Sequence, residues 1–444
     1  MNFPAVALQV PTILLPREDV DLAAWAVIAC DQYTSQPAYW EAVERLVGER
    51  PSTLRLMLPE AHLASADRPQ RITAIHATMQ RYLEQGVLRP CAPGFVLVNR
   101  TDSAGRTRRG LVAALDLEAY SYAPTAASLI RASEGTVLER LPPRADVRRG
   151  AALESPHVMV LIDDPERSVV EPLFDEQLPR LYDTDLMQGG GHVQGWLVDQ
   201  ERLWRKVAIN LARLAGPEWF ATRHGLADRP VLLYAMGDGN HSFATAKLVW
   251  EEIRRAGADR AALQAHPARH ALVEIVNVHD EGLRFEPIHR LVSGVEPQRL
   301  LRRMQLHFQA AGCACSCQPY ESLARLRAEL ERPHSRAMHL VPCLSAEGCA
   351  LLRIDTPRSA LPVGSLEGFF EAEGLRPPQL DYIHGDQVLT ELAQRPGCVG
   401  FVLPPLSKHD IFRTVVLDGA LPRKTFSVGG ADDKRFYLEC RRIA

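Results

Sequence analysis

Val231-Leu-Leu-Tyr-Ala-Met236, followed at once by Gly237-Asp-Gly-Asn-His-Ser242, is the most informative part of the sequence. Its first half is short, apolar and uncharged, which predicts a strand over residues 230–236. Phosphates are often bound where a strand, a glycine turn and a helix follow one another in this order. Apolar residues recur at helical spacing after the glycines and predict a helix over residues 242–255; they are Phe243, Ala246, Trp250 and Ile253. The stretch therefore predicts an α/β fold of mixed strands and helices, with a candidate site at the turn.

The turn carries residues suited to binding an anion; they are Gly237, Asp238, Gly239, Asn240, His241 and Ser242. Glycines allow a sharp turn that brings backbone amides near a ligand, and the first turn of a helix offers unpaired N–H groups at its positive end. Three side chains add donors, and His241 could also stabilise developing charge. The motif predicts a phosphate- or nucleotide-binding site. The alternative is a tight turn in which Asn240 or Ser242 caps the helix and His241 packs against its neighbours.

Two widespread nucleotide-binding motifs do not match this sequence. Ser242 occupies the place of the third glycine in the dinucleotide-binding fingerprint, and no acidic residue ends a second strand about 20 residues further on. The glycine-lysine-serine or threonine run of a P-loop does not occur in the chain. A nucleotide site at this turn would belong to a less common kind.

The composition of the chain is that of an ordinary folded protein. Its 444 residues favour two domains, and its 46% hydrophobic content is near the globular average. A net charge of -3 gives no general attraction for nucleic acid or anionic membranes. The start of the chain does not resemble a signal peptide, no apolar run has membrane-spanning length, and nine scattered cysteines suit a reducing compartment. We therefore expect a cytoplasmic protein that binds neither nucleic acid nor membranes.

Local patterns predict the organisation of the chain. Short apolar segments at residues 94–98 and 111–117 predict a hairpin, and the loss of periodicity over residues 120–149 predicts a long loop, functional or merely solvated. Cys313, Cys315 and Cys317 alternate at strand spacing, which favours one face of a strand over a zinc site because no returning ligand pair follows. The predicted domains are residues 1–295, which contain the candidate site, and residues 296–444, a smaller α/β domain.

A candidate general base lies near the start of the chain. Asp31 is in a loop before a predicted helix that Ser35 would cap, and a positioned carboxylate can deprotonate an acceptor hydroxyl. The alternative is that Asp31 only forms a turn or caps the helix entry. The adjacent Cys30 could be a nucleophile, but it ends an apolar run, as small buried residues do.

Several charged residues could bind phosphate. Arg131 and Arg140 could form a phosphate clamp with Glu134 as its orienting carboxylate or as a second candidate base, because guanidinium groups match phosphate oxygens in pairs. The alternative is an exposed ion network. His289 and the Arg423-Lys424 pair also end apolar segments, and Lys424 would neutralise a transferred phosphate. These cationic residues could equally be surface charge.

Six runs, in order along nearly the whole chain, resemble a known family; they are Trp25–Trp40, Arg131–Arg140, Pro156–Pro165, Gly237–Ser242, Glu286–Arg290 and Leu421–Phe426. The family is bacterial and archaeal and is called domain of unknown function 1015. It is similar to the free serine kinases, which share the ParB and sulfiredoxin fold and bind nucleotide phosphates through an aspartate-glycine-histidine-histidine-arginine motif. Asp238, Gly239 and His241 match this motif, whereas Asn240 replaces its first histidine and Ser242 its arginine. The resemblance implies a ParB/sulfiredoxin-like core and a nucleotide site with a different phosphate grip.

These features favour an enzyme, a nucleotide-dependent phosphotransferase that acts on a small hydroxylated metabolite with Mg²⁺ and ATP or ADP as cofactors. The glycine turn would bind the phosphates, Asp31 or Glu134 would be the base, and the cationic residues above would balance charge. No set of protein residues with metal-ligand spacing is identified. The alternatives are a nucleotide-binding regulator with slow hydrolysis or none, and a metabolite-binding protein without chemistry. A DNA-binding regulator would carry a helix-turn-helix and a basic surface, which the sequence does not indicate.

Overall fold

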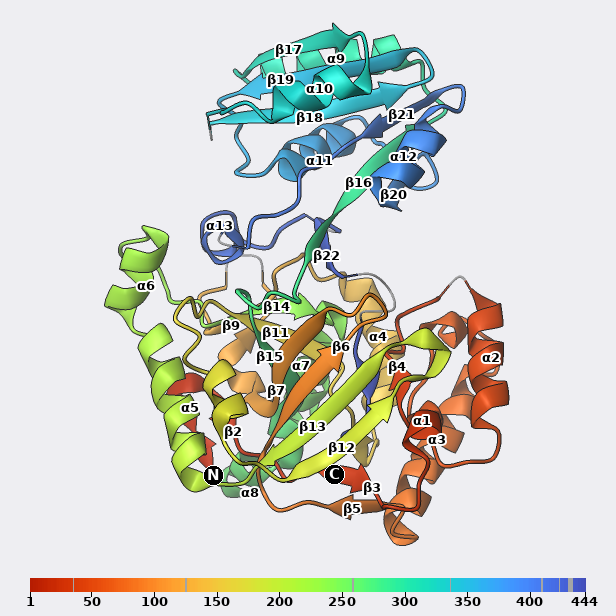
Figure 1. Ribbon diagram of the computed structural model, residues 1–444, viewed down its shortest axis with the longest axis vertical. Coiled ribbons are helices and arrows are strands. Elements are labelled where there is room, and N and C mark those ends of the chain that lie inside the picture. Colours follow the sequence, from red (N-terminus) through yellow and green to blue (C-terminus); the bar gives the residue numbers. More distant parts are fainter. Residues whose placement is uncertain are drawn as a thin grey trace. The chain divides into compact units, whose positions relative to one another are not determined.

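The computed structural model of the chain describes residues 1–34, 36–123, 126–257, 259–335, 337–408, 410–422, 424–429 and 434–444 (Figure 1). The predicted helix cap Ser35 and the candidate Arg423 lie outside these residues. The fold is α/β, as predicted. Its contacts form two compact units: the larger unit comprises Met1–Arg284 and Val428–Ala444, and the smaller unit comprises Phe285–Ser427.

The larger unit is built on a mixed sheet with the strand order β12-β13-β6-β7-β15-β11-β14-β9-β8, to which β2 adds through β7 and β1 through β2. Within this sheet β11 is parallel to β15, and β9 is parallel to both β8 and β14. The strands of the unit are β1 (Asn2–Phe3), β2 (Leu8–Gln9), β3 (Leu14–Pro16), β4 (Val27–Ile28), β5 (Leu88–Pro90), β6 (Phe95–Thr101), β7 (Thr107–Asp116), β8 (Tyr120–Ser121), β9 (Ile130–Arg131), β10 (Leu153–Glu154), β11 (Val158–Ile162), β12 (Arg180–Asp185), β13 (His192–Val198), β14 (Tyr234–Asp238), β15 (His270–Asn277), β23 (Phe436–Tyr437) and β24 (Arg441–Arg442). Its helices are α1 (Leu22–Trp25), α2 (Pro37–Val47), α3 (Arg68–Glu84), α4 (Leu141–Arg148), α5 (Glu201–Leu214), α6 (Pro217–His224), α7 (Asn240–Ala256) and α8 (Arg260–Ala265).

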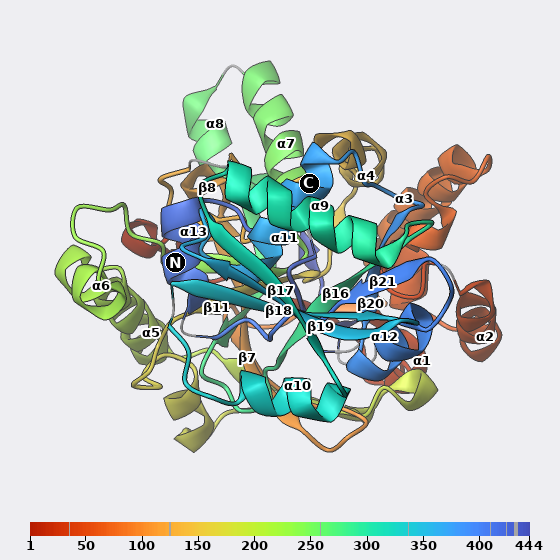
Figure 2. The same ribbon diagram turned by 90° about the horizontal axis from the view of Figure 1, so that it is seen from above.

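The smaller unit is an antiparallel sheet with the strand order β17-β19-β18-β21-β16-β20, and β22 pairs with β16. Helices α9 and α10 lie on opposite sides of this sheet, each over its own apolar cluster (Figure 2). The strands are β16 (Phe285–Ser293), β17 (Ala314–Tyr320), β18 (Met338–Ser345), β19 (Gly348–Asp355), β20 (Leu380–His384), β21 (Cys398–Phe401) and β22 (Phe426–Val428). The helices are α9 (Pro297–Ala310), α10 (Leu323–Leu330), α11 (Pro362–Ala372), α12 (Asp386–Ala393) and α13 (Asp410–Asp418).

The two units divide the chain at other points than the predicted boundary near Glu296. Strand β16, which precedes that residue, pairs with β20 and β21 of the smaller unit. From Val428 the chain belongs again to the larger unit, where β23 pairs with β4 and β24 pairs with β10. The last strands therefore complete the larger unit, and no local pattern in the sequence indicates this return.

Both faces of the large sheet are buried. Alternate residues of a strand point to opposite faces, and Phe95 of β6 packs in one core cluster with Phe243 of α7. The next residue, Val96, packs in a second cluster with Trp40 of α2. Burial on both faces explains why the first part of β6, Phe95–Val98, is a continuous apolar run and not an alternating one.

Several local predictions are confirmed and one is partly wrong. Strands β6 and β7 form the predicted hairpin, and Cys315 and Cys317 lie in β17, packed against the core of the smaller unit. The predicted loop over residues 120–149 instead contains β8, β9 and helix α4. Pro142 and Pro143 resemble helix breakers, but proline at the start of a helix removes no helical hydrogen bond. This missed helix bears on the site, because it forms one of the cavity walls.

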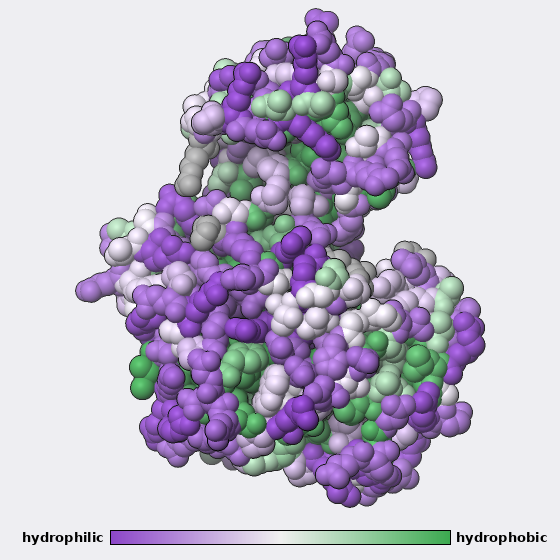
Figure 3. Space-filling model, viewed as in Figure 1, coloured by the Kyte–Doolittle hydropathy of each residue, from purple (hydrophilic) through white to green (hydrophobic). Residues whose placement is uncertain are grey.

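One face of the surface can be described by its hydropathy. The face drawn in Figure 3 is mainly hydrophilic, and hydrophilic side chains interrupt its hydrophobic patches. Among the described helices, none is long and apolar enough to cross a membrane.

Candidate functional site

The predicted strand-to-helix turn is present. Strand β14 ends at Asp238, Gly239 has a φ of +77°, and α7 begins at Asn240. A side chain at residue 239 would be strained at this φ, and its Cβ would lie 3.1 Å from Cδ2 of His157 and from the Cα of Val158. Only glycine fits these constraints well, so the turn is pressed directly against the start of β11. The strand begins at Tyr234, later than the predicted residue 230.

Strand β11 places a histidine under the turn. Met159 of β11 pairs with Asp238 of β14, so His157, two residues before Met159, lies beside the glycine. On the other side, the pairing of β23 with β4 brings Tyr437 opposite Val27. Segments that are far apart in the sequence therefore meet at the first turn of α7.

Four residues form what we call the His157 cluster; they are Cys30, Asp31, His157 and Tyr437. The Nε2 atom of His157 lies 3.6 Å from Oδ2 of Asp31, and its Nδ1 atom hydrogen-bonds the hydroxyl of Tyr437. The same hydroxyl accepts a hydrogen bond of 3.1 Å from the backbone amide of Cys30, whose Sγ lies 4.0 Å from Nδ1. The histidine ring is thus fixed between a carboxylate and a phenol.

The electrostatics of the cluster favour a carboxylate and an imidazolium. Burial raises the pKa of Asp31, but the charge and hydrogen bond of His157 lower it by more, so the net pKa lies below its ordinary value. Burial lowers the pKa of His157, but Tyr437 and Asp31 raise it by more, and the net pKa lies well above its ordinary value. Asp31 is therefore ionised over the physiological range and remains 26% exposed at its side chain.

A second ion pair closes the turn. Lys434 Nζ lies 2.8 Å from Oδ2 of Asp238, while Oδ1 of Asp238 accepts a hydrogen bond of 2.9 Å from the amide of Gly239. The charge of Lys434 also contributes to the lowered pKa of Asp31. One ammonium group thus faces the carboxylates on both sides of the turn.

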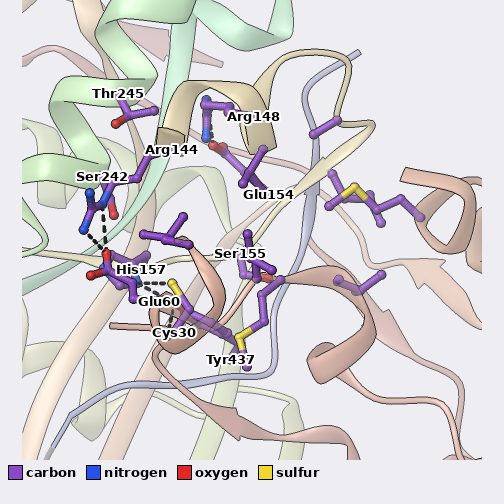
Figure 4. A pocket seen from close by; sticks show the side chains of 18 residues that line it. Cys30, Glu60, Arg144, Arg148, Glu154, Ser155, His157, Ser242, Thr245 and Tyr437 are labelled. Carbon is purple, nitrogen blue, oxygen red and sulfur yellow. Dashed lines mark hydrogen bonds and ion pairs between the residues drawn. The ribbon is translucent and has the colours of Figure 1, made fainter. Parts of the chain in front are cut away.

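A cavity of about 170 Å³ opens beside the turn (Figure 4). Ser242 and Thr245 of α7, together with Cys30 and His157, form part of its wall. Two ion pairs also line it, between Glu60 and Arg144 and between Arg148 and Glu154, with nitrogen-to-oxygen distances of 2.8 Å and 2.6 Å. The remaining wall is mostly apolar and comprises Leu56, Met57, Leu58, Leu63, Met79, Val147, Ala151 and Leu153, with Ser155 and Tyr437.

Arg131, Glu134 and Arg140, the residues of the predicted clamp, are not among the described residues that line this cavity. Arg131 is buried, and its guanidinium donates hydrogen bonds to the carbonyls of Ser128, Pro230 and Val231. Burial lowers its pKa to about 10. Arg131 therefore ties β9 to the segment before β14, because buried carbonyls need donors. Its role in phosphate binding stays a prediction.

The other two members of that clamp lie in the segment between β9 and α4. Glu134 is half-buried, and Arg140 is exposed and accepts a hydrogen bond from Arg144 through its carbonyl. The same segment contacts α7, since the amide of Val137 donates a hydrogen bond of 3.2 Å to Nε2 of His241. His241 thus anchors a neighbouring backbone segment at the turn.

Two further candidates belong to the smaller unit. His289 pairs with Asp386 at 2.9 Å and accepts a hydrogen bond from the amide of Leu403. Lys424 places its Nζ 4.8 Å from the ring centroid of Tyr382. The described contacts of both residues lie within that unit, whereas the glycine turn, the His157 cluster and the cavity lie within the larger unit.

Sequence reasoning missed several residues of the site. His157 was within the run Pro156–Pro165 that supported the family resemblance, but nothing local distinguished it from a residue entering a strand. Tyr437 and Lys434 follow the return of the chain to the larger unit, which has no local signal. Arg148 was hidden with α4 in the predicted loop.

Comparisons with solved structures found weak similarities. A free serine kinase in complex with AMP is 10% identical, covers 73% of this chain and 90% of its own, and gives a TM-score of 0.36. A conserved hypothetical protein from Pyrococcus furiosus is 10% identical, with coverages of 75% and 94% and a TM-score of 0.32. SbnI from Staphylococcus aureus, truncated at its C-terminus, is 9% identical, with coverages of 72% and 83% and a TM-score of 0.34.

No curated protein matches the chain. A family model described as "Protein of unknown function (DUF1015)" matches residues 13–368, which is most of the sequence. The resemblance carried by the six sequence runs is thereby confirmed, and the chain belongs to the DUF1015 family.

Proposed function

We propose that this protein is a nucleotide-dependent phosphotransferase that acts on a small hydroxylated metabolite. The observation that supports this function best is the placement of an ionised carboxylate, Asp31, beside the first turn of α7 and next to the cavity residues Cys30 and His157. Transfer of a phosphoryl group depends mainly on positioning and on charge stabilisation. The site offers a carboxylate for the acceptor and positive charge for the phosphates.

The phosphates of the nucleotide would bind at the start of α7. The first N–H groups of a helix have no partner within the helix, and the helix dipole makes this end positive. Ser242 adds a hydroxyl, and Lys434 adds an ammonium group 2.8 Å from Asp238. The Oδ1 atom of Asn240 is buried without a hydrogen-bond partner among the described residues. Such an acceptor needs a donor, which a ribose hydroxyl would supply.

Asp31 would act as the general base. It would accept the proton of the acceptor hydroxyl while the acceptor oxygen forms a bond to the terminal phosphorus, and the bond from that phosphorus to the nucleotide's bridging oxygen breaks. The lowered pKa of Asp31 keeps it ionised, so it orients the hydroxyl throughout and takes the proton late. His157 would fix the carboxylate and supply positive charge near the transferred group.

Mg²⁺ with ATP or ADP is part of the proposal. Among the described residues no group of three or more histidine, cysteine or acidic side chains could enclose a metal ion. Magnesium sites that serve nucleotides often use only one or two carboxylates and the phosphates themselves. Asp238, at the end of β14, fits that requirement, and the ion would supply further neutralisation of phosphate charge.

A thermal-shift screen of nucleotides with and without Mg²⁺ tests binding, because a ligand of the folded state raises its melting temperature. Phosphorus NMR with a panel of small hydroxylated acceptors, serine among them, then tests transfer. Replacing His241 with Ala should strongly weaken nucleotide binding, since it frees the segment that Val137 ties to the turn. Absence of any nucleotide or phosphate binding in the wild type would reject the proposal.

A binding protein without turnover is the second candidate. The observation that favours it is that Arg131, one of the cations predicted to bind phosphate, donates hydrogen bonds to three backbone carbonyls. Such a regulator would bind the nucleotide as well as an enzyme does, but it would hydrolyse it slowly or transfer nothing. Nucleotide binding without phosphate transfer to any acceptor would select this function.

A further inference from the structure

Three charged groups on one side of the cavity are not balanced. Glu154 accepts hydrogen bonds from Arg441 at 2.6 Å and 2.8 Å and from Arg148 at 2.6 Å. Glu154 also accepts a hydrogen bond of 2.9 Å from the backbone amide of Leu272. One carboxylate is thus shared by two guanidinium groups, and this group of side chains carries a net charge of about +1, because arginine stays protonated.

This excess charge lies in a mostly buried place. The side chains of Arg148, Glu154 and Arg441 are 17%, 5% and 6% exposed. The other two ion pairs at the cavity, Glu60 with Arg144 and Asp31 with His157, are each balanced when ionised. Buried charge is costly unless it is paired. The cavity is therefore best suited to a ligand that brings one negative charge.

Arg148 is the residue that can bind this charge. Among the described residues, Glu154 is the sole hydrogen-bond partner of its guanidinium, through Nη2. Arginine has five N–H donors in a planar fork that matches a carboxylate. Arg441, in contrast, also donates to the carbonyls of Pro267 and His270 and is not part of the cavity wall.

The rest of the wall sets the body of the ligand. Apart from its polar and charged residues the lining is mainly aliphatic, and it includes Leu56–Leu58, Leu63 and Met79. An apolar cavity of about 150 Å³ accommodates benzene, so about 170 Å³ suits a body of similar size and not a whole nucleotide. Serine, whose ammonium group would meet the positive Arg148 side or the apolar wall, fits this lining poorly.

We propose that the acceptor of the phosphotransferase is a small hydroxy acid with an aliphatic body, whose carboxylate binds Arg148 and whose hydroxyl faces the His157 cluster. The phosphorylation of the hydroxyl in this inference rests on the proposed function. Its binding half rests only on the cavity, so it is measurable without nucleotide. The nucleotide phosphates remain at the start of α7, on the Ser242 side of the cavity.

Calorimetry with three probes tests the proposal on the full chain without nucleotide. Leucic acid, the hydroxy acid with the side chain of leucine, has about nine non-hydrogen atoms and suits the cavity. Its amide has nearly the same shape and no charge, whereas serine has the carboxylate but also carries an ammonium group and lacks the aliphatic body. We expect leucic acid to bind about 10- to 100-fold more tightly than either probe. The amide loses the bidentate arginine–carboxylate contact, and serine loses the apolar contact.

Arg148→Met should weaken leucic acid about 10- to 100-fold and leave the amide unchanged, so that the preference for the acid disappears. The variant should fold, because Glu154 retains Arg441. Arg149→Gln is the matched control: Arg149 is the next residue, is 43% exposed, and pairs with Glu252 outside the cavity. Equal binding of acid and amide by the wild type, or an undiminished preference in Arg148→Met, would overturn the proposal.

The failure of this proposal and the failure of the proposed function give different results. Binding of leucic acid that depends on Arg148, without phosphate transfer from any nucleotide, retains the hydroxy-acid site and rejects the transferase. Phosphate transfer to serine but not to leucic acid retains the transferase and rejects the hydroxy-acid site. If inorganic phosphate and acetate displace leucic acid equally well, the cavity is a general anion site. That result would also reject the hydroxy-acid site.

Discussion

The larger and smaller units each contain a strand, a glycine of positive φ and a helix in succession. In the larger unit β14 leads through Gly239, at φ +77°, into α7. In the smaller unit β20 leads through Gly385, at φ +86°, into α12. The same order of strand, glycine and helix therefore occurs twice, but the backbone of the two glycines differs, with a ψ of +27° at Gly239 and +132° at Gly385.

The surroundings of the two turns differ. A Cβ on Gly239 would touch the start of β11, whereas a Cβ on Gly385 would meet nothing within 4 Å. The first turn of α12 already carries a carboxylate, Asp386, which is 58% exposed. At α7, by contrast, His157 and Lys434 bring positive charge to the turn and a cavity opens beside it. A glycine turn thus becomes a candidate phosphate site only through what other segments bring to it.

The largest expected difference between the turns is in catalysis. Asp31→Asn removes the proposed base and should lower the rate of phosphate transfer about 100- to 10,000-fold while nucleotide affinity changes little. Asp386→Asn, at the other turn, should leave the rate unchanged. Single-turnover kinetics and nucleotide titrations measure the two effects separately. Equal rates in wild type and Asp31→Asn would remove Asp31 from the mechanism.

The next effect is on stability. Gly385→Ala should cost about 1–3 kcal/mol, the cost of placing a side chain in a sparsely populated region of positive φ, because the added Cβ meets open space. Gly239→Ala adds a clash with His157 and Val158, and overpacking raises its expected cost to about 2–4 kcal/mol.

Urea unfolding can assign these costs to the two units. All six tryptophans belong to the larger unit, so their fluorescence measures the effect of Gly239→Ala on the unfolding of that unit. Hydrogen exchange of the backbone amides of β20 and α12 measures the effect of Gly385→Ala on the stability of the smaller unit. A larger cost for Gly385→Ala than for Gly239→Ala would contradict the close packing of the first turn.

The same comparison explains how far the sequence was informative. The glycine turn, the β6–β7 hairpin and the family were predictable because each depends on neighbouring residues or on runs of residues. The contacts of Arg131 with backbone carbonyls were not predictable, because an arginine that binds carbonyls cannot be distinguished in sequence from one that binds phosphate. Tyr437 reaches the site through a strand pairing with residues at the other end of the chain, which no local pattern encodes.

A histidine–aspartate pair adjoins each turn, and we expect the two histidines to carry different charges. Burial lowers the pKa of His157, but Tyr437 and Asp31 raise it by more, to well above its ordinary value. Burial also lowers the pKa of His289, and its carboxylate partner offsets this only in part. Its Nδ1 accepts a hydrogen bond of 3.1 Å from Leu403, which a proton on that atom would break. His157 is therefore expected to be protonated near neutral pH and His289 to be neutral.

The smallest effect should be an opposite pH dependence of stability, since each histidine contributes one proton. The folded-state pKa of His157 is raised, so its stabilisation is complete below the unfolded pKa of about 6.5 and is lost as the pH rises through the folded value. The folded-state pKa of His289 is lowered. Its contribution to stability is therefore complete above the unfolded pKa of about 6.5 and is lost as the pH falls toward the folded-state pKa. NMR titration of both rings measures the two values, and the stability difference between wild type and His157→Gln should shrink as the pH is raised from below 6.5. If His157 titrated below His289, the cluster would hold no imidazolium, and the positive charge assigned to it beside the phosphates would have to come from Lys434 alone.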